Sequence, residues 1–392
     1  MNVTQQGIAA LMKSAMLQQP QPLPEGFEIQ AAMPLIRRHH IAALVYDGAE
    51  RCGLPRQEPT MRKLFQTYCS SLLVSEGQER EIARIFAAFD ENGIDYLPLK
   101  GCNMKALYPK PELRVMGDAD ILIRMEQYSR IVPVMESLGF EHKYESDHEL
   151  VWKSPALEVE LHKYLIPTYN RDMYAYFGDG WQLAVPGAGS RWNMTPEDTF
   201  VFLFAHFAKH YRDGGIGCRH VLDLWVYLRA NPNLDMGRVR TALEKLGLQE
   251  FFCNISRLLD VWFEGAQPDD RTEYLSEFIF ASGSWGNMEQ RILSESVRSM
   301  QRSGLGRAGK LRHLWRMAFP PVEALQGKYP VLRRAPWLLP AVWLIRPVYK
   351  LLFERKSLAQ RKRVMDAMTR ENLDTRQQML HYVGLEYDQT SP

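Results

Sequence analysis

The chain has 392 residues, of which 46% are hydrophobic and 24% are charged, and its formal net charge is +2. This length suits two or three domains with a sizeable core, and the composition is typical of a soluble globular protein. No run of about 20 apolar residues occurs, which argues against a membrane-spanning helix. The nearest candidate, residues 335–345, is too short and contains two prolines.

The five cysteines are scattered along the chain and form no CxxC pair. Their odd number and wide spacing argue against a disulfide framework or a structural zinc site and fit a reducing cytosol. The N-terminal segment lacks the basic start and continuous apolar run of a secretory signal. The sequence therefore predicts a cytoplasmic protein, and the tail described below leaves peripheral membrane attachment as an alternative.

The first 93 residues read as a helical region. Between positions 72 and 89 apolar residues recur at helical spacing, and Gly93 follows as a stop signal. The pattern then changes to short apolar segments bounded by turn residues, which indicate strands. We expect strands at 94–101, 118–123, 148–154 and 157–166, with helices between them at 102–109 and 125–140.

Thr195 is placed to cap the next helix, since Pro196 and two acids follow it. From there to about residue 302 the chain looks helical. These patterns predict an α+β fold in which helical regions flank a small mixed sheet. We expect four parts: an N-terminal helical region at 1–93, the mixed-sheet core at 94–190, a helical domain at 191–300 and a basic helical tail at 301–392.

The tail differs from the rest of the chain in charge. Residues 301–363 contain 15 Lys/Arg and two acids, so this segment carries 15 − 2 = +13 and the remainder +2 − 13 = −11. Trp337 and Trp343 lie among its cations, which suits an interfacial segment, although prolines interrupt any long helix. We rank docking on the body of the protein first, an anionic membrane surface or anionic polymer second and nucleic acid third. We expect most of the tail's apolar side chains to be covered by the protein itself.

Asp118 and Asp120 stand at the start of a predicted strand. Side chains alternate along a strand, so both carboxylates point to one face, while Ala119 and Ile121 point to the other. Two like charges about 6–7 Å apart are costly to bury without a cation. Mg²⁺ prefers oxygen ligands and is usually bound by one or two carboxylates and substrate phosphates. Taken alone, the pair is more often a surface turn than a metal site, and it is the surrounding residues that favour a site for Mg²⁺ or Mn²⁺.

Other side chains near the aspartates suit phosphate chemistry. Glu158 and Glu160 share one face of a later predicted strand, and a third carboxylate would complete a two-metal clamp. Gly101 lies between a strand and a helix, where glycine lets backbone amides approach an anion. Lys100 adds a point charge, and Arg114 a planar fork that matches phosphate oxygens.

The order of strand and glycine, short helix, D-x-D and later acid resembles the nucleotidyltransferase superfamily that includes DNA polymerase beta. More narrowly, the segments LPLKG, LRVMGDADILI, GF and VELH resemble an uncharacterised bacterial nucleotidyltransferase family over about residues 75–230. Lys100 and Gly101 stand where the broader superfamily has Gly-Ser. The resemblance implies that the catalytic residues and metal ligands are Asp118, Asp120 and Glu160.

Several further residues are candidates for the nucleotide side of the site. His162 shares the strand face of Glu160, so it either contacts phosphate or is a buried structural histidine. His206 and His210 are one helical turn apart, but no HExxH zinc motif accompanies them. The resemblance implies that the nucleotide or acceptor side of the cleft is lined by His206, Lys209, His210 and Asp223. A polar network between two helices is the alternative.

The residues and the resemblance together predict transfer of a nucleoside monophosphate from a nucleoside triphosphate to an acceptor. A divalent metal ion would take part and pyrophosphate would leave. Catalysis would depend on positioning and charge neutralisation, with Glu160 or Asp120 helping to deprotonate the acceptor. The alternatives are a non-catalytic nucleotide-binding module and transfer of the γ-phosphoryl group.

Overall fold

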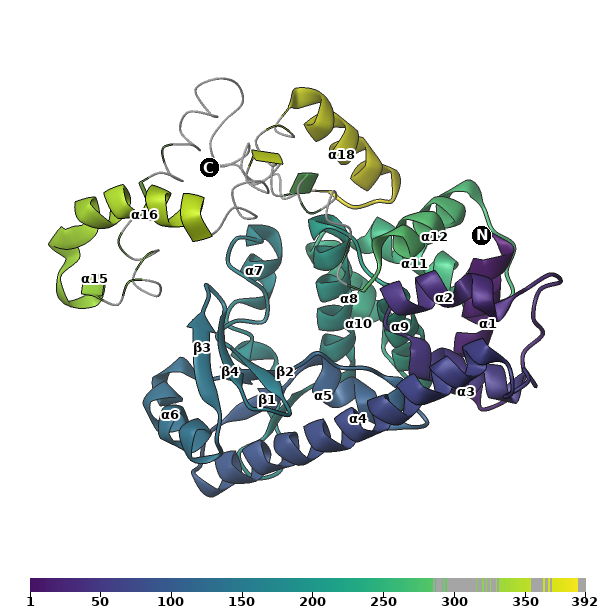
Figure 1. The fold of residues 1–392 in the computed structure, drawn as a ribbon, viewed down its shortest axis with the longest axis horizontal. Helices are drawn as coiled ribbons and strands as arrows, with labels where there is room; N and C mark the ends of the chain where they lie inside the picture. Colours follow the sequence, from purple (N-terminus) through teal and green to yellow (C-terminus); the bar gives the residue numbers. More distant parts are fainter. Residues whose placement is uncertain are drawn as a thin grey trace.

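The computed structural model describes residues 1–284, 331–353 (backbone only from 347) and 369–386, and single residues between these ranges: 286, 291, 293, 294, 315, 319, 320, 322, 325, 329, 362, 363 and 366. These residues form an α+β protein in which helices flank a small mixed sheet (Figure 1). The predicted fold class is confirmed.

Four helices precede the sheet: α1 (Val3–Leu17), α2 (Ile29–Arg38), α3 (Ala42–Arg51) and α4 (Pro59–Glu91). The longest, α4, has 33 residues and runs along the base of the molecule in Figure 1. It begins with proline in its first turn, where no backbone donor is needed. After it ends, Gly93 takes a left-handed conformation with φ of +59°, which directs the chain into the sheet.

The sheet has five strands in the order β1-β2-β5-β4-β3. The strands are β1 (Tyr96–Pro98), β2 (Asp118–Ile123), β3 (Glu141–Glu145), β4 (Glu149–Lys153) and β5 (Glu158–His162). β2 and β5 are parallel, whereas the other neighbouring pairs are antiparallel. Of these five strands, only β3 was not predicted. It is an edge strand whose residues are all exposed, so it lacks the apolar alternation that identifies a half-buried strand.

β2 and β5 divide their side chains between two unlike faces. One face belongs to an apolar core shared with α4 and with α6 (Tyr128–Ser137). The residues of β2 and β5 in this core are Ala119, Ile121, Ile123, Val159 and Leu161. The alternation that buries these residues turns the acidic residues of both strands toward the opposite face, which is the face of the candidate site.

The helices that follow β5 pack beside that polar face. Short elements come first: α5 (Lys100–Met104) after β1, and α7 (Arg171–Phe177), β6 (Ala184–Pro186) and β7 (Trp192–Met194) after β5. The longer helices are α8 (Pro196–Asp213), α9 (Cys218–Ala230), α10 (Met236–Lys245), α11 (Gln249–Leu259) and α12 (Asp270–Ser282). Thr195 caps α8 as predicted, since its side chain accepts a hydrogen bond from the backbone of Asp198. One apolar core takes residues from α1–α3 and from α8–α12 (Figure 1).

The end of the chain returns to this body. In α18 (Arg370–Tyr382), Arg376 is buried and donates to the carbonyl oxygens of Tyr211 and Arg212, both at 3.1 Å. α15 (Val331–Arg334) and α16 (Leu339–Phe353) instead share a small separate core (Figure 1). None of the helices in the described part of the chain has the length and apolar character needed to cross a bilayer.

The expectation that the tail covers its own apolar side chains is wrong for Trp337, which is 77% exposed. Trp343 is half-buried against the small core, as expected. Much of 301–363, including the side chain of Leu351, lies outside the described residues. The four domain boundaries stay predictions.

Candidate active site

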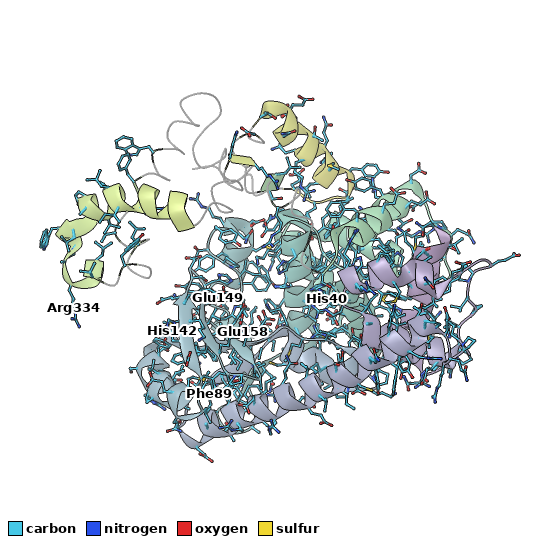
Figure 2. The ribbon with its side chains drawn as sticks, viewed as in Figure 1. His40, Phe89, His142, Glu149, Glu158 and Arg334 are labelled. Carbon is cyan, nitrogen blue, oxygen red and sulfur yellow. The ribbon has the colours of Figure 1, made fainter. Side chains whose placement is uncertain are left out.

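A cavity of about 620 Å³ lies between the polar face of the sheet and helices α8 and α9. Its sheet side carries Asp118, Asp120 and Glu160, and its helical side carries histidines, Lys209 and Arg219. Glu149, at the start of β4, also lines it, whereas Glu158 lies toward the other end of the β4–β5 pair (Figure 2). Acids and bases thus face each other across one cavity.

The parallel register of β2 and β5 brings the carboxylates together. Asp118 is paired with Glu158, and Asp120 with Glu160. Paired residues of neighbouring strands point to the same face, so all four acids share the polar face. Glu158 is bound to Lys153 at 2.9 Å. Glu160, two residues further along, is the acid that joins the two aspartates in the cavity.

Within the described part of the chain, Asp120, Glu160 and His162 form a close cluster of potential metal ligands. One ligand atom from each lies within 4.8 Å of the other two. His162 Nε2 is 2.9 Å from Asp120 Oδ1 and 3.5 Å from Glu160 Oε2. Burial opposes protonation of this histidine, but its contacts with Asp120 and Glu160 raise its pKa to about 9. His162 is therefore protonated near neutral pH and orients the carboxylates.

Charge in the cluster is only partly balanced. Burial, and then Asp120 and Glu160, raise the pKa of Asp118 to about 7. Burial alone would also raise the pKa of Asp120, but Lys100 and His162 hold it well below its usual range. When Asp118 is ionised, the three carboxylates (Asp118, Asp120 and Glu160) and the two cations (Lys100 and His162) give the cluster a net charge of −3 + 2 = −1. Oxygen ligands with excess negative charge fit a divalent metal ion, so the residues present suit Mg²⁺ or Mn²⁺.

Lys100 connects the acidic cluster to α8. Its ammonium lies 2.6 Å from Asp120 Oδ1 and 3.2 Å from His206 Nε2. Its backbone is left-handed, with φ of +33°, which is uncommon for a residue with a side chain. From the sequence we expected the unusual backbone conformation of this turn at Gly101, but in the structure the left-handed residue is Lys100. Space at Gly101 is limited, because a Cβ there would lie 2.7 Å from Met116 Sδ and that side chain would have to move.

Arg114 and Asp223 line the cavity but bind each other. The guanidinium makes two hydrogen bonds of 2.9 Å to the carboxylate, which also accepts from Tyr108 at 2.8 Å. All three side chains are buried. Asp223 is therefore bound to the segment before β2 and not to a second helix. A direct contact of Arg114 or Asp223 with nucleotide stays a prediction.

The histidines of α8 face the same cavity. His206 and His210 are in ring contact, with 3.0 Å between their Nε2 atoms. Burial, and then neighbouring cations, hold the pKa of both imidazoles well below the usual value, so both are neutral near pH 7. Lys209 is buried and also lines the cavity. Apart from Glu158, every residue singled out from the sequence for the site lines this cavity.

Arg219 and His220 were not singled out from the sequence, yet both line the cavity. Arg219 donates to the carbonyl oxygen of Val115, and its Nε is buried without a hydrogen-bond partner among the described residues. Burial, and then Arg219, lower the pKa of His220 to about 3. The spacing of residues in α9 could have identified Arg219. It precedes Asp223 by one helical turn, so both side chains project from the same side of the helix.

Comparison with known proteins agrees with this geometry. A family model described as an uncharacterised nucleotidyltransferase matches residues 25–264, a longer stretch than the resemblance seen in the sequence. A search of curated proteins and a search of solved structures each gave no match.

Proposed function

The chain belongs to the uncharacterised nucleotidyltransferase family, and from that premise we propose that it transfers a nucleoside monophosphate from a nucleoside triphosphate to an acceptor, releasing pyrophosphate. The observation that carries the proposal is the convergence of Asp118, Asp120 and Glu160 on one wall of a cavity of about 620 Å³. That volume is in the usual range for small-molecule sites. The three carboxylates would hold Mg²⁺ or Mn²⁺.

When bound, the metal ions would neutralise phosphate charge and lower the pKa of the acceptor hydroxyl. The chain supplies the orientation. His162 and Lys100 both contact Asp120 Oδ1, which fixes that carboxylate and keeps it ionised. His206 contacts the same ammonium from α8, so the position of Lys100 depends on both walls of the cavity.

Glu160 is the better candidate for the base that accepts the acceptor's proton. Asp120 is held ionised by two cationic partners, and a carboxylate with a pKa well below the usual range is a weak base. Glu160 has a longer contact of 3.5 Å to His162 and a hydrogen bond with Asp118, and its side chain is 17% exposed at the cavity. An acceptor oxygen entering the cavity can reach it.

The phosphates would lie against the basic wall. Arg219 and Lys209 line the helical side opposite the acids, and Lys100 lies between the two walls. Arg219 combines a planar fork with a buried, unpartnered Nε among the described residues, so it is better placed to bind a phosphate oxygen than Arg114. We assign Arg114 and Asp223 to holding α9 against the loop before β2.

Product analysis with two labels tests the reaction. The full-length chain is incubated with a cell extract, Mg²⁺ or Mn²⁺, and each nucleoside triphosphate labelled at either the α- or the γ-phosphorus. Nucleotidyl transfer predicts labelled pyrophosphate from the γ-label and an acceptor that retains the α-label. Labelled acceptor from the γ-label, with nucleoside diphosphate, would identify a phosphotransferase instead.

Two variants make the result interpretable. Asp118→Asn with Asp120→Asn should abolish both products, whereas Asp95→Asn should not, because Asp95 is bound to Arg124 at 2.8 Å as part of a separate ion pair. Binding of triphosphate without any product in all extracts would support the non-catalytic binding module.

A further inference from the structure

Helix α16 has two unlike faces. On its inner face, Val342 is buried in a small core with Leu325 and Leu332. Trp343 Nε1 donates a hydrogen bond of 2.9 Å to the carbonyl oxygen of Pro320. These contacts determine which side of the helix packs on the protein.

The opposite face is apolar and exposed. Leu344 and Ile345 are 78% and 62% exposed. Pro340 and Ala341, one turn earlier, are exposed as well, and so is Trp337 just before the helix. We call these five residues the outer stripe. No charged residue is among them, and contiguous exposed apolar surface of this kind marks an interaction site.

Cations flank the outer stripe. Residues 331–353 contain four Lys/Arg and no acid. Arg334 is exposed at the end of α15, where it points away from the body of the protein (Figure 2). Further along the chain, Lys362 and Arg363 are exposed too. The whole segment 301–363 carries +13, as counted above. A partner that covers this region must combine an apolar layer with negative charge.

An anionic bilayer surface has both properties. Interfacial helices place an apolar face at the headgroup boundary, often with aromatic residues on that face, while nearby Lys and Arg attract anionic headgroups. We propose that the outer stripe docks on an anionic lipid surface, with the flanking arginines and lysines binding lipid phosphates. The proposal does not depend on the catalytic assignment.

Vesicle co-sedimentation of the full-length chain tests the proposal. We expect binding to phosphatidylcholine vesicles that contain phosphatidylserine, weaker binding to phosphatidylcholine alone, and loss of binding as salt is added, because charge attraction is screened. Leu344→Gln with Ile345→Gln should lower the partition coefficient roughly tenfold or more, since two large apolar side chains no longer leave water. Replacing Arg333 and Arg334 by glutamine should lower it roughly tenfold as well.

The chain offers a matched control. Leu73 and Val74 of α4 are also adjacent, aliphatic and exposed, at 71% and 55%. Leu73→Gln with Val74→Gln should bind vesicles as the wild type does. In a second readout, brominated lipids should quench tryptophan fluorescence in the wild type and quench less in Trp337→Phe, which keeps the fold because this side chain is exposed.

Several results would overturn the proposal. One is no binding of the wild type to anionic vesicles at low salt, and another is equal binding by the Leu344/Ile345 variant. A wild-type dimer that this variant converts to a monomer, without any lipid binding, would show that a second copy covers the outer stripe. A lower melting temperature of the variant without lipid binding would show that the chain itself covers it.

Discussion

Lys100, which is half-buried, and Asp120, which is buried, form an ion pair with 2.6 Å between Nζ and Oδ1. The lysine is the first residue of α5, and its left-handed backbone is of a kind that costs of order 1–3 kcal/mol. The contacts with Asp120 and His206 hold it in place. A positive charge therefore lies inside the acidic cluster, on the side of the cavity that faces α8.

Lys100→Ala should weaken binding of a non-hydrolysable nucleoside triphosphate, in the presence of Mg²⁺, by roughly tenfold to a hundredfold. The reason is the loss of one charge-assisted hydrogen bond to phosphate, worth about 1.5–3 kcal/mol. Titration calorimetry measures the change. Lys105→Ala is the control. Lys105 belongs to the same short stretch of chain as Lys100 and is buried, but its ammonium binds Glu79 at 3.1 Å. It should lower the melting temperature and leave the affinity unchanged. Equal affinity in wild type and Lys100→Ala would make Lys100 a bystander.

Asp118→Asn should have opposite effects on the free and the ligand-bound protein. Without metal, ionised Asp118 is destabilised by burial and then by repulsion from Asp120 and Glu160, so the neutral amide should raise the free energy of unfolding at pH 8 by about 1–2 kcal/mol. With Mg²⁺ and triphosphate the wild type gains stability by mass action, and the variant should lose most of that gain.

Chemical denaturation at pH 8, with and without Mg²⁺ and triphosphate, measures both effects of Asp118→Asn. Asp95→Asn serves as the control and should keep the wild-type response to ligand, because its partner Arg124 belongs to a separate pair. An unchanged ligand-induced gain in Asp118→Asn with Asp120→Asn would remove the metal assignment.

Glu160→Gln should lower kcat by about a hundredfold or more, the usual range for loss of a general base or metal ligand. Glu158→Gln is a closely matched control, since it changes the same residue type on the same strand and the same face. Glu158 binds Lys153 instead of joining the cluster, so its variant should stay within about twofold of wild type, as expected for a surface pair. Similar losses of kcat in both variants would show that activity depends on the overall negative charge of this face of β5 and not on Glu160 in particular.

The acidic cluster shows how much of the site could be predicted from the sequence. Strand alternation placed Asp118 and Asp120 on one face, and the structure agrees because Ala119 and Ile121 belong to the opposite core. The choice between Glu158 and Glu160 was not decided by alternation, since both share the face. It is decided by the parallel register and by Lys153, which are relations between strands that a single segment does not encode.

Long-range pairing accounts for most of what the sequence did not predict. Arg114 looked like a phosphate fork, but Asp223, 109 residues later, binds its guanidinium. β3 has no buried residue, so its pairing with β4 left no pattern in the sequence. The limited space at Gly101 likewise comes from Met116, a residue of the separate segment before β2.

Breaking the buried Arg114–Asp223 pair should be strongly destabilising. Asp223→Asn leaves an uncompensated buried guanidinium, and Arg114→Met leaves an uncompensated carboxylate, so each should lower the free energy of unfolding by about 3–5 kcal/mol. The double variant should lose less free energy of unfolding than the sum of the two single losses, because no unpaired charge remains. Urea denaturation of the four proteins in the cycle measures the coupling. Additive losses would show that the two side chains do not act as a pair.

His39 should make the fold sensitive to mild acid. It is fully buried, its Nε2–H donates to the carbonyl oxygen of Phe280 at 3.1 Å, and its Nδ1 accepts from the backbone of Cys218 at 3.2 Å. Burial lowers its pKa from 6.5 to about 4. Between pH 6.5 and pH 4, position 39 is therefore protonated in the unfolded chain but not in the folded one. Stability should therefore fall as pH is lowered from about 7 to 4, by up to about 3 kcal/mol from this residue. His39→Gln keeps one donor and one acceptor but does not titrate. Comparing unfolding of the two proteins across this pH range isolates the contribution of His39, and an identical slope in both would show that it contributes none.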